Sequence, residues 1–206
     1  MIEKLTQDAL ILWATIDPIG TMALFAALTA RLTPAERRRT AFKAIIYAAL
    51  VLIGSIVIGQ VILNAMGIRL VSFQLGGGII LFLFGLQMIF SADPQPATKE
   101  PEPEHDMAVF PIAIPATATP GAILAVILLT DNHVYPVTVQ IGTALIVVGI
   151  LAVTLVLLLL SEKIIKIIGT SGASILTRVM GMILAALSVE LVMNALSIGQ
   201  WIQPAP

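Results

Sequence analysis

Asp17 and Pro18 are the first residues whose types and order could do chemistry. They lie inside an apolar run from about Leu5 to Leu32, and about 20 apolar residues are enough to cross a bilayer. Proline disfavours the α conformation in the residue before it and suits the first position of a new helix, with aspartate as its N-cap. The pattern therefore predicts a broken span, with one half ending near Ile16 and a second half starting at Pro18.

Thr119 and Pro120 repeat this arrangement inside a second apolar run, from about Val109 to Thr130. The start of each half-helix would present free N–H groups and a partial positive charge near mid-membrane, which suits an anionic group. Two broken spans at matching places in the two halves of a chain indicate a transporter binding site. The residues that we expect to bind substrate are those at the breaks: Asp17, Pro18, Ile19, Gly20, Thr21, Thr119, Pro120, Gly121 and Ala122.

Two carboxylates are candidates for coupling transport to an ion. An ionisable residue inside a span costs about 2.5–3.5 kcal/mol on insertion scales, so it usually has a role. Asp17 either contacts a substrate ammonium group or coupling cation, or only caps the half-helix. Glu190 lies near the centre of the last apolar run and shares a helical face with Asn194 and Ser197. We expect Glu190 to be buried, where a protonated carboxyl group suits proton coupling and equally a hydrogen bond between helices.

Small residues in the spans have two interpretations. Gly76, Gly77 and Gly78 form a run that could let the backbone approach the substrate, or let helices pack closely. We include all three among the candidate substrate-binding residues. The pair Gly181 and Ala185 indicates a close helix contact.

Composition identifies the class of protein. The 206 residues are 58% hydrophobic and 11% charged, with a mean hydropathy of +1.03, whereas soluble domains are about 25% charged. This is the composition of an all-α polytopic membrane protein whose main partner is the lipid bilayer. The net charge of −1 gives no sign of nucleic-acid binding.

The sequence lacks the usual parts of an enzyme or a metal site in the spans. It has no Cys, and both histidines, His105 and His133, fall in expected loops. No nucleotide-binding loop of the Gly-x-x-x-x-Gly-Lys type is present. We therefore expect no enzyme activity, no cofactor and no metal centre. Gln60 and Asn64 could line a vestibule, although hydrogen bonding between helices is the favoured interpretation.

Six spans are expected, at about 5–31, 38–66, 69–91, 109–130, 136–161 and 176–201. Thr33 and Glu36 form a capping box at the start of the second span. A polar, Pro-rich loop follows the third span. The expected organisation is a first three-helix repeat at 1–91, an acidic cytoplasmic loop at 92–107, and a second three-helix repeat at 108–206.

Lys and Arg counts predict the orientation in the plasma membrane. Nine of the eleven lie in the loops after the first, third and fifth spans or beside them, and only Lys4 and Arg69 lie on the other side. The positive-inside rule places the Arg37–Arg39 segment in the cytoplasm and both termini outside. Three spans per half force the halves into opposite orientations, which predicts an inverted repeat.

The chain resembles the MarC family of six-span membrane proteins, within the group that includes the LysE-type exporters. The resembling segments are Asp17 to Gly20 with Phe25 and Leu28–Thr29, Pro34 to Arg39, Gly76 to Phe82, Pro111 to Pro115, Pro120 to Ile123, and Gly181 to Asn194. Three positions depart from the usual family pattern: Ala23 where Pro is common, Thr119 where Gly is usual, and Glu190 where Gln is common.

The resemblance implies transport of small neutral amino acids, with glycine and alanine as typical candidates. The small residues around the breaks extend this expectation to serine. Alternating access around the two broken helices is the expected mechanism, with a proton or sodium as a possible coupling ion. An exporter of an ion or divalent metal cation is the alternative, with Asp17 and Glu190 as the carboxylates at depth. Transport direction and oligomeric state stay open.

Overall fold

The computed structural model describes residues 2–90 and 106–196, and every regular element in this part of the chain is a helix. In chain order the elements are α1 (Ile2–Ile16), α2 (Pro18–Leu28), α3 (Pro34–Ala65), α4 (Leu70–Phe90), the π-helical η1 (Ala108–Thr117), α5 (Pro120–Leu129) and α6 (Val137–Ala195). Helix α6 reverses direction at Gly169, whose φ of 70° is open to glycine at little cost. We call Val137–Gly169 its first limb and Ser174–Ala195 its second limb.

Six helical segments within residues 2–90 and 106–196 are long and apolar enough to span a membrane when the bent pair η1 and α5 counts as one. The expectation of an all-helical polytopic membrane protein is therefore confirmed. Local chain chemistry sets the helix starts: Thr33 and Glu36 form the expected capping box, in which the Thr33 N–H donates to the Glu36 carboxylate over 2.8 Å. The expected loop at 92–107 lies almost wholly outside the described residues, so the division of the chain into two repeats stays a prediction.

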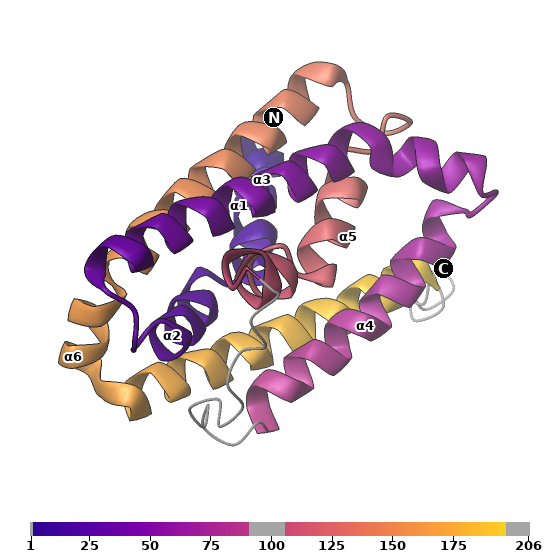
Figure 1. The fold of residues 1–206 in the computed structure, drawn as a ribbon. Coiled ribbons are helices and arrows are strands. Elements are labelled where there is room, and N and C mark those ends of the chain that lie inside the picture. Colours follow the sequence, from indigo (N-terminus) through magenta and orange to yellow (C-terminus); the bar gives the residue numbers. More distant parts are fainter. Residues whose placement is uncertain (1, 91–105, 197–206) are drawn as a thin grey trace.

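The two halves of the chain have the same order of elements. Each begins with a broken span, α1–α2 in the first half and η1–α5 in the second, and continues with two longer helical segments. Figure 1 shows α4 beside the second limb of α6, with the shorter helices between the long ones. The first broken span is more enclosed than α4: half of its apolar window is buried, against 17% for α4. The breaks thus lie inside the bundle and not at its edge.

Helices α4 and α6 cross at small residues. A Cβ added to Gly85 would lie 2.9 Å from both the Gly181 carbonyl oxygen and the Ala185 nitrogen. The expected helix contact at Gly181 and Ala185 is therefore confirmed, because the two backbones meet here with no room for a side chain.

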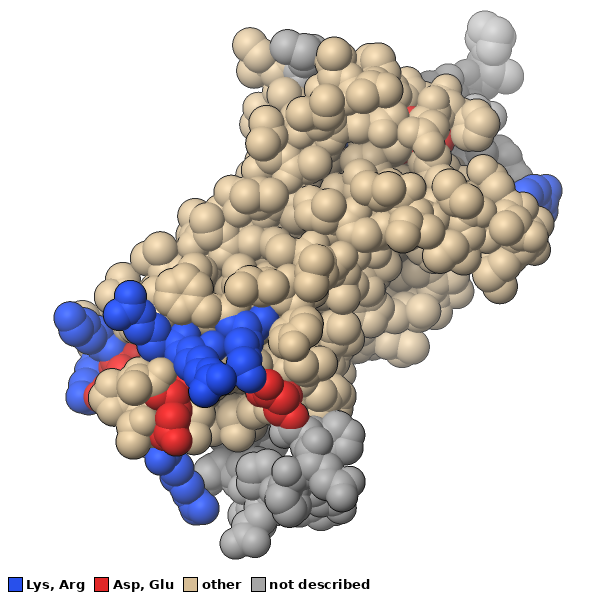
Figure 2. Space-filling model, turned by 45° about the horizontal axis from the view of Figure 1, so that its top comes forward, with Lys and Arg blue, Asp and Glu red and all other residues tan. Residues whose placement is uncertain are grey.

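Lysine and arginine gather at one end of the molecule, which we call the basic end (Figure 2). Ion pairs connect its elements: Arg37 to Glu162 at 2.8 Å, and Lys43 to Asp106 at 2.7 Å. The starts of α3 and η1 and the later part of the first limb of α6 therefore meet there. Lys4 lies at the opposite end, beside the last residue of α5.

Candidate functional site

Asp17 alone forms the first helix break. Its N–H donates to the Trp13 carbonyl and so completes α1, while its own carbonyl accepts from the Thr21 N–H and so begins α2. The backbone of Asp17 is left-handed, with φ 49° and ψ 68°, a conformation that Asp tolerates better than most residues. Its carboxylate accepts from the Gly20 N–H over 3.1 Å, as an N-cap does. The predicted half-helix start at Pro18 is confirmed.

The second break has a different backbone conformation, but it also has a capped half-helix that starts at proline. Thr119 is extended, with φ −66° and ψ 155°, and its hydroxyl oxygen accepts from the Ala122 N–H over 2.9 Å. Helix α5 starts at Pro120, as predicted, and is bent by 54° from η1. Before the break, η1 holds Pro111 and Pro115, so its backbone departs from a regular α-helix.

The structure brings the two breaks together through reciprocal hydrogen bonds. The Thr119 hydroxyl at the start of α5 donates to the Thr15 carbonyl at the end of α1, over 2.6 Å. The Thr21 hydroxyl in the first turn of α2 donates to the Ala116 carbonyl at the end of η1, over 2.9 Å. Both threonine side chains are almost completely buried. Each break therefore satisfies a carbonyl that the other break exposes.

This junction concentrates helix-end charge away from water. Helices α2 and α5 both start here with proline, and the first turn of each directs N–H groups and a partial positive charge towards the junction. The ends of α1 and η1 contribute carbonyl oxygens of opposite polarity. An arrangement of this kind can hold a group that is anionic at one point and cationic at another, without a metal or cofactor.

The other predicted break residues lie close to the junction. Pro18, Gly121 and Ala122 are buried, Ile19 and Gly20 are half-buried, and Pro120 is exposed. Gly20 is tightly constrained, because an added Cβ would overlap the Asp17 carboxyl group that caps the helix.

The three consecutive glycines of α4 have three different surroundings. A Cβ on Gly77 would meet Leu124 of α5, and one on Gly78 would meet Val192 of the second limb of α6. Gly76 is exposed, with nothing within 4 Å of an added Cβ. Helix packing is therefore visible at Gly77 and Gly78, and Gly76 does not face the breaks.

Glu190 and Asn194 are not brought to the junction. Both are exposed, and the Asn194 amide donates to the Glu190 carboxylate over 3.2 Å. The expectation that Glu190 is buried is wrong, because the second limb of α6 directs Ser188 and Val192 towards α4 instead. Ser197, the third residue of the expected polar face, lies outside the described residues.

A buried ionic group at the opposite end was not predicted. Asp8 of α1 is 1% exposed, and its Oδ2 accepts from the Lys4 ammonium group and from the Thr143 hydroxyl, each over 2.6 Å. The Lys4 ammonium also donates to the Leu129 carbonyl over 2.9 Å and lies 4.0 Å from the centre of the Tyr135 ring. The spacing of four residues between Lys4 and Asp8 is the sequence signal that could have indicated this ion pair.

Gln60 closes the same end from α3. Its amide donates to Asp131 over 3.2 Å, and its carbonyl oxygen accepts from the Asn132 N–H over 3.1 Å. The Gln60 amide also donates to the Ile127 carbonyl of α5 over 3.4 Å, so hydrogen bonding between helices is confirmed for Gln60, whereas Asn64 is exposed. Gln60 and Asn64 also border a small hollow of about 30 Å³.

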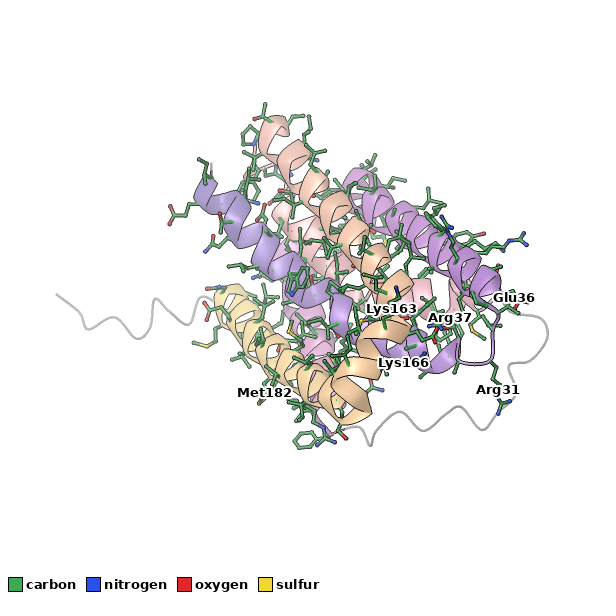
Figure 3. The ribbon with its side chains drawn as sticks, turned by 90° about the vertical axis from the view of Figure 1, so that its left-hand side faces the viewer. Arg31, Glu36, Arg37, Lys163, Lys166 and Met182 are labelled. Carbon is green, nitrogen blue, oxygen red and sulfur yellow. The ribbon has the colours of Figure 1, made fainter. Side chains whose placement is uncertain are left out.

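A larger pocket of about 310 Å³ opens at the basic end. It lies between α2, the start of α3 and the first limb of α6, and is lined by Phe25, Pro34, Arg37, Arg38, Leu158, Leu159 and Glu162. Figure 3 shows Arg37 near Lys163 and Lys166 at this end. Two of the lining residues, Phe25 and Leu158, are each 1% exposed, and Phe25 shares a face of α2 with Thr21, four residues earlier. Phe25 therefore connects the wall of the pocket to the face of α2 that carries the junction residue Thr21.

The sequence model of the MarC family, described as an integral membrane protein family, matches residues 2–199. The chain belongs to the MarC family. The resemblance found in the sequence is thereby confirmed over nearly the whole chain. No group of three or more His, Asp, Glu or Cys side chains that could hold a metal ion occurs within residues 2–90 and 106–196.

Relatives of this MarC-family chain occur in bacteria and archaea. A membrane protein of Archaeoglobus fulgidus is 33% identical, over 90% of this chain and 89% of its own. A membrane protein of Buchnera aphidicola is 27% identical over 94% and 96%, and the inner membrane protein MarC of Citrobacter koseri is 30% identical over 86% and 87%. No solved structure matches the chain.

Proposed function

We propose that this protein is a secondary transporter of small neutral amino acids, of the glycine, alanine and serine class, in the bacterial inner or archaeal plasma membrane. The observation that carries the proposal is the buried junction where two proline-led half-helices start side by side and exchange hydrogen bonds through Thr21 and Thr119. Broken helices cost stability inside a membrane unless their free ends serve a site. The name of the Citrobacter koseri relative supports the inner membrane.

An amino acid offers the two charges that the junction can receive. Its carboxylate would lie against the first turns of α2 and α5, where helix-end charge is positive. Its ammonium group would replace the threonine hydroxyls as donor to the carbonyls of Thr15 and Ala116. Ala118 and Ala122 are completely buried beside the junction, so we expect only a small substrate side chain to fit there.

The two ends of the molecule differ in the way that alternating access requires. The pocket at the basic end reaches Phe25, while the opposite end is closed by the hydrogen bonds of Lys4, Asp8 and Gln60. The structure therefore resembles a state that is open towards the basic end, with Phe25 above the junction. Rocking of one half against the other would reverse this asymmetry.

Uptake of labelled alanine and glycine into proteoliposomes tests the proposal. We expect saturable uptake that excess unlabelled alanine inhibits. Thr119→Val should reduce uptake by about tenfold or more, because it removes two buried hydrogen bonds that each cost about 1–3 kcal/mol to lose. Thr119→Ser is the matched control, since it keeps the hydroxyl group and should retain uptake.

Two outcomes would overturn the proposal. One is the absence of amino-acid uptake by folded protein under any ion gradient. The other is uptake of divalent cations instead, which would favour the metal-exporter alternative. Equal uptake by the Thr119→Val and Thr119→Ser variants would show that transport does not depend on the hydrogen bonds of the junction.

A further inference from the structure

The Asp8 side chain has one oxygen without a partner. Its Oδ2 is bound by Lys4 and Thr143, whereas its Oδ1 is buried and accepts no hydrogen bond. Within the described ranges, this is the one buried side-chain nitrogen or oxygen in that condition. Leaving a buried polar atom unsatisfied costs about 1–3 kcal/mol, and more for a charged group. A bonding partner for Oδ1 from outside the helix bundle would therefore stabilise this end of the molecule.

The surroundings of Asp8 hold one cation, two neutral side chains and a second carboxylate. Lys4 on its own helix is the nearest charge, and Tyr135 of the α5–α6 connection faces the Lys4 ammonium group. From α6 comes the Thr143 hydroxyl. The carboxylate of Asp131, in the same connection as Tyr135, accepts hydrogen bonds from the Gln60 amide and from the His133 N–H. The ion pair of Lys4 with Asp8 is therefore the main electrostatic bond holding this end of α1.

The ion pair of Lys4 with Asp8 lies at the C-terminal end of α5. The carbonyl of Leu129, the last residue of α5, accepts from the Lys4 ammonium group, so the ion pair connects α1 to the negative end of a half-helix. The positive end of the same half-helix forms the junction. The ion pair is therefore linked, through the length of α5, to the break at which α5 begins.

We propose that Asp8 Oδ1 is the site that binds the coupling proton of the transporter. This inference rests on the proposed function. A proton from water at this end reaches the enclosed Oδ1 past the partly exposed Lys4 side chain and bonds to it, and the resulting neutral acid no longer attracts the Lys4 ammonium group. The Lys4 side chain, 19% exposed, then turns to water, and α1 is released from the end of α5. Loss of the proton restores the ion pair and closes this end.

A proton suits the site better than a metal cation. Metal cations bound by oxygen need several ligands, but Oδ1 is enclosed, and Oδ2 and the Leu129 carbonyl already hold Lys4. A proton needs only the single free oxygen. The two carboxylates predicted for coupling are engaged differently: Asp17 caps α2 and Glu190 is exposed.

Infrared difference spectroscopy after a drop in pH tests this site without any transport. We expect acidification to produce the C=O stretching bands of protonated carboxylic acids, and Asp8→Asn to lose one band of this set. Glu3→Gln, which alters an exposed carboxylate on the same helix, should keep it.

An unchanged band in Asp8→Asn would overturn the proposal. If Asp8→Asn does not fold, Thr143→Val serves instead: it removes the hydroxyl group that donates to Asp8 Oδ2, so the frequency of the band should change, and an unchanged frequency would overturn the proposal.

Proteoliposomes supply the second arm. In Asp8→Asn, stimulation of alanine uptake by an inward proton gradient should be lost, while exchange of alanine for alanine without a gradient should persist. Stimulation by a sodium gradient alone, or retained proton stimulation in the variant, would overturn the assignment. If the wild type moves no alanine, the proposed function fails and the infrared result still decides whether Asp8 binds a proton.

Discussion

At the scale of single residues, Asp17 ends one helix and begins the next, which requires both a left-handed backbone and a capping carboxylate. Asn meets both requirements, because its amide oxygen can cap and it tolerates the left-handed region. We therefore predict that Asp17→Asn keeps stability and uptake, and that Asp17→Ala loses about 1–3 kcal/mol. Thermal unfolding in detergent and uptake assays check this. Loss of uptake in a stable Asn variant would show instead that the negative charge contacts substrate or cation.

A second residue-scale prediction concerns pH. The Lys43 ammonium group, with the Ala108 N–H, holds the pKa of Asp106 below its usual value of 3.8. A lowered pKa means that the stabilisation is complete above the usual value and is lost as pH falls through the lowered one. At pH 7, Asp106→Asn should therefore lower the free energy of unfolding by less than about 1 kcal/mol, because the ion pair is exposed. The variant should unfold at a slightly lower temperature. The difference from wild type should vanish in strong acid; a constant difference would contradict it.

At the scale of elements, α4 has glycines that differ in their neighbours. Gly85 crosses the backbone of α6, where an added Cβ would lie 2.9 Å from two backbone atoms, whereas Gly76 faces open space. Gly85→Ala should cost about 1–3 kcal/mol through overpacking. Gly76→Ala should be neutral or stabilise by up to about 1 kcal/mol, because alanine favours the helix. Thermal unfolding of the two variants checks this, and equal losses would mean that α4 and α6 do not pack in this way.

At the scale of the whole molecule, the basic end predicts orientation. Lysine and arginine gather on one side of the spans (Figure 2), which the positive-inside rule places in the cytoplasm. Because the chain has no Cys, a single introduced cysteine is the one thiol of the protein that a reagent can label. We predict that Asn132→Cys, exposed at the opposite end, reacts with an impermeant thiol reagent in intact cells. Ala30→Cys, exposed at the basic end, should react only after permeabilisation; the reverse pattern would invert the topology.

Local chemistry allowed the sequence by itself to determine much of the fold. Apolar length set the six spans, and the order Asp17-Pro18 and Thr119-Pro120 set the two breaks, because capping and proline geometry involve only adjacent residues. The capping box at Thr33 and Glu36 was predictable for the same reason. Membership of the MarC family was also evident before the structure.

Tertiary structure alone decided which faces are buried. Helices that are apolar on all sides carry no periodicity to mark the packed face, so Glu190 was expected inside and lies outside. Asp8 was passed over and is buried, because its partner Thr143 is 135 residues away. The meeting of the two breaks likewise depends on hydrogen bonds across 95 and 104 residues. Such contacts arise only when the helices pack, since no local interaction within either half specifies them.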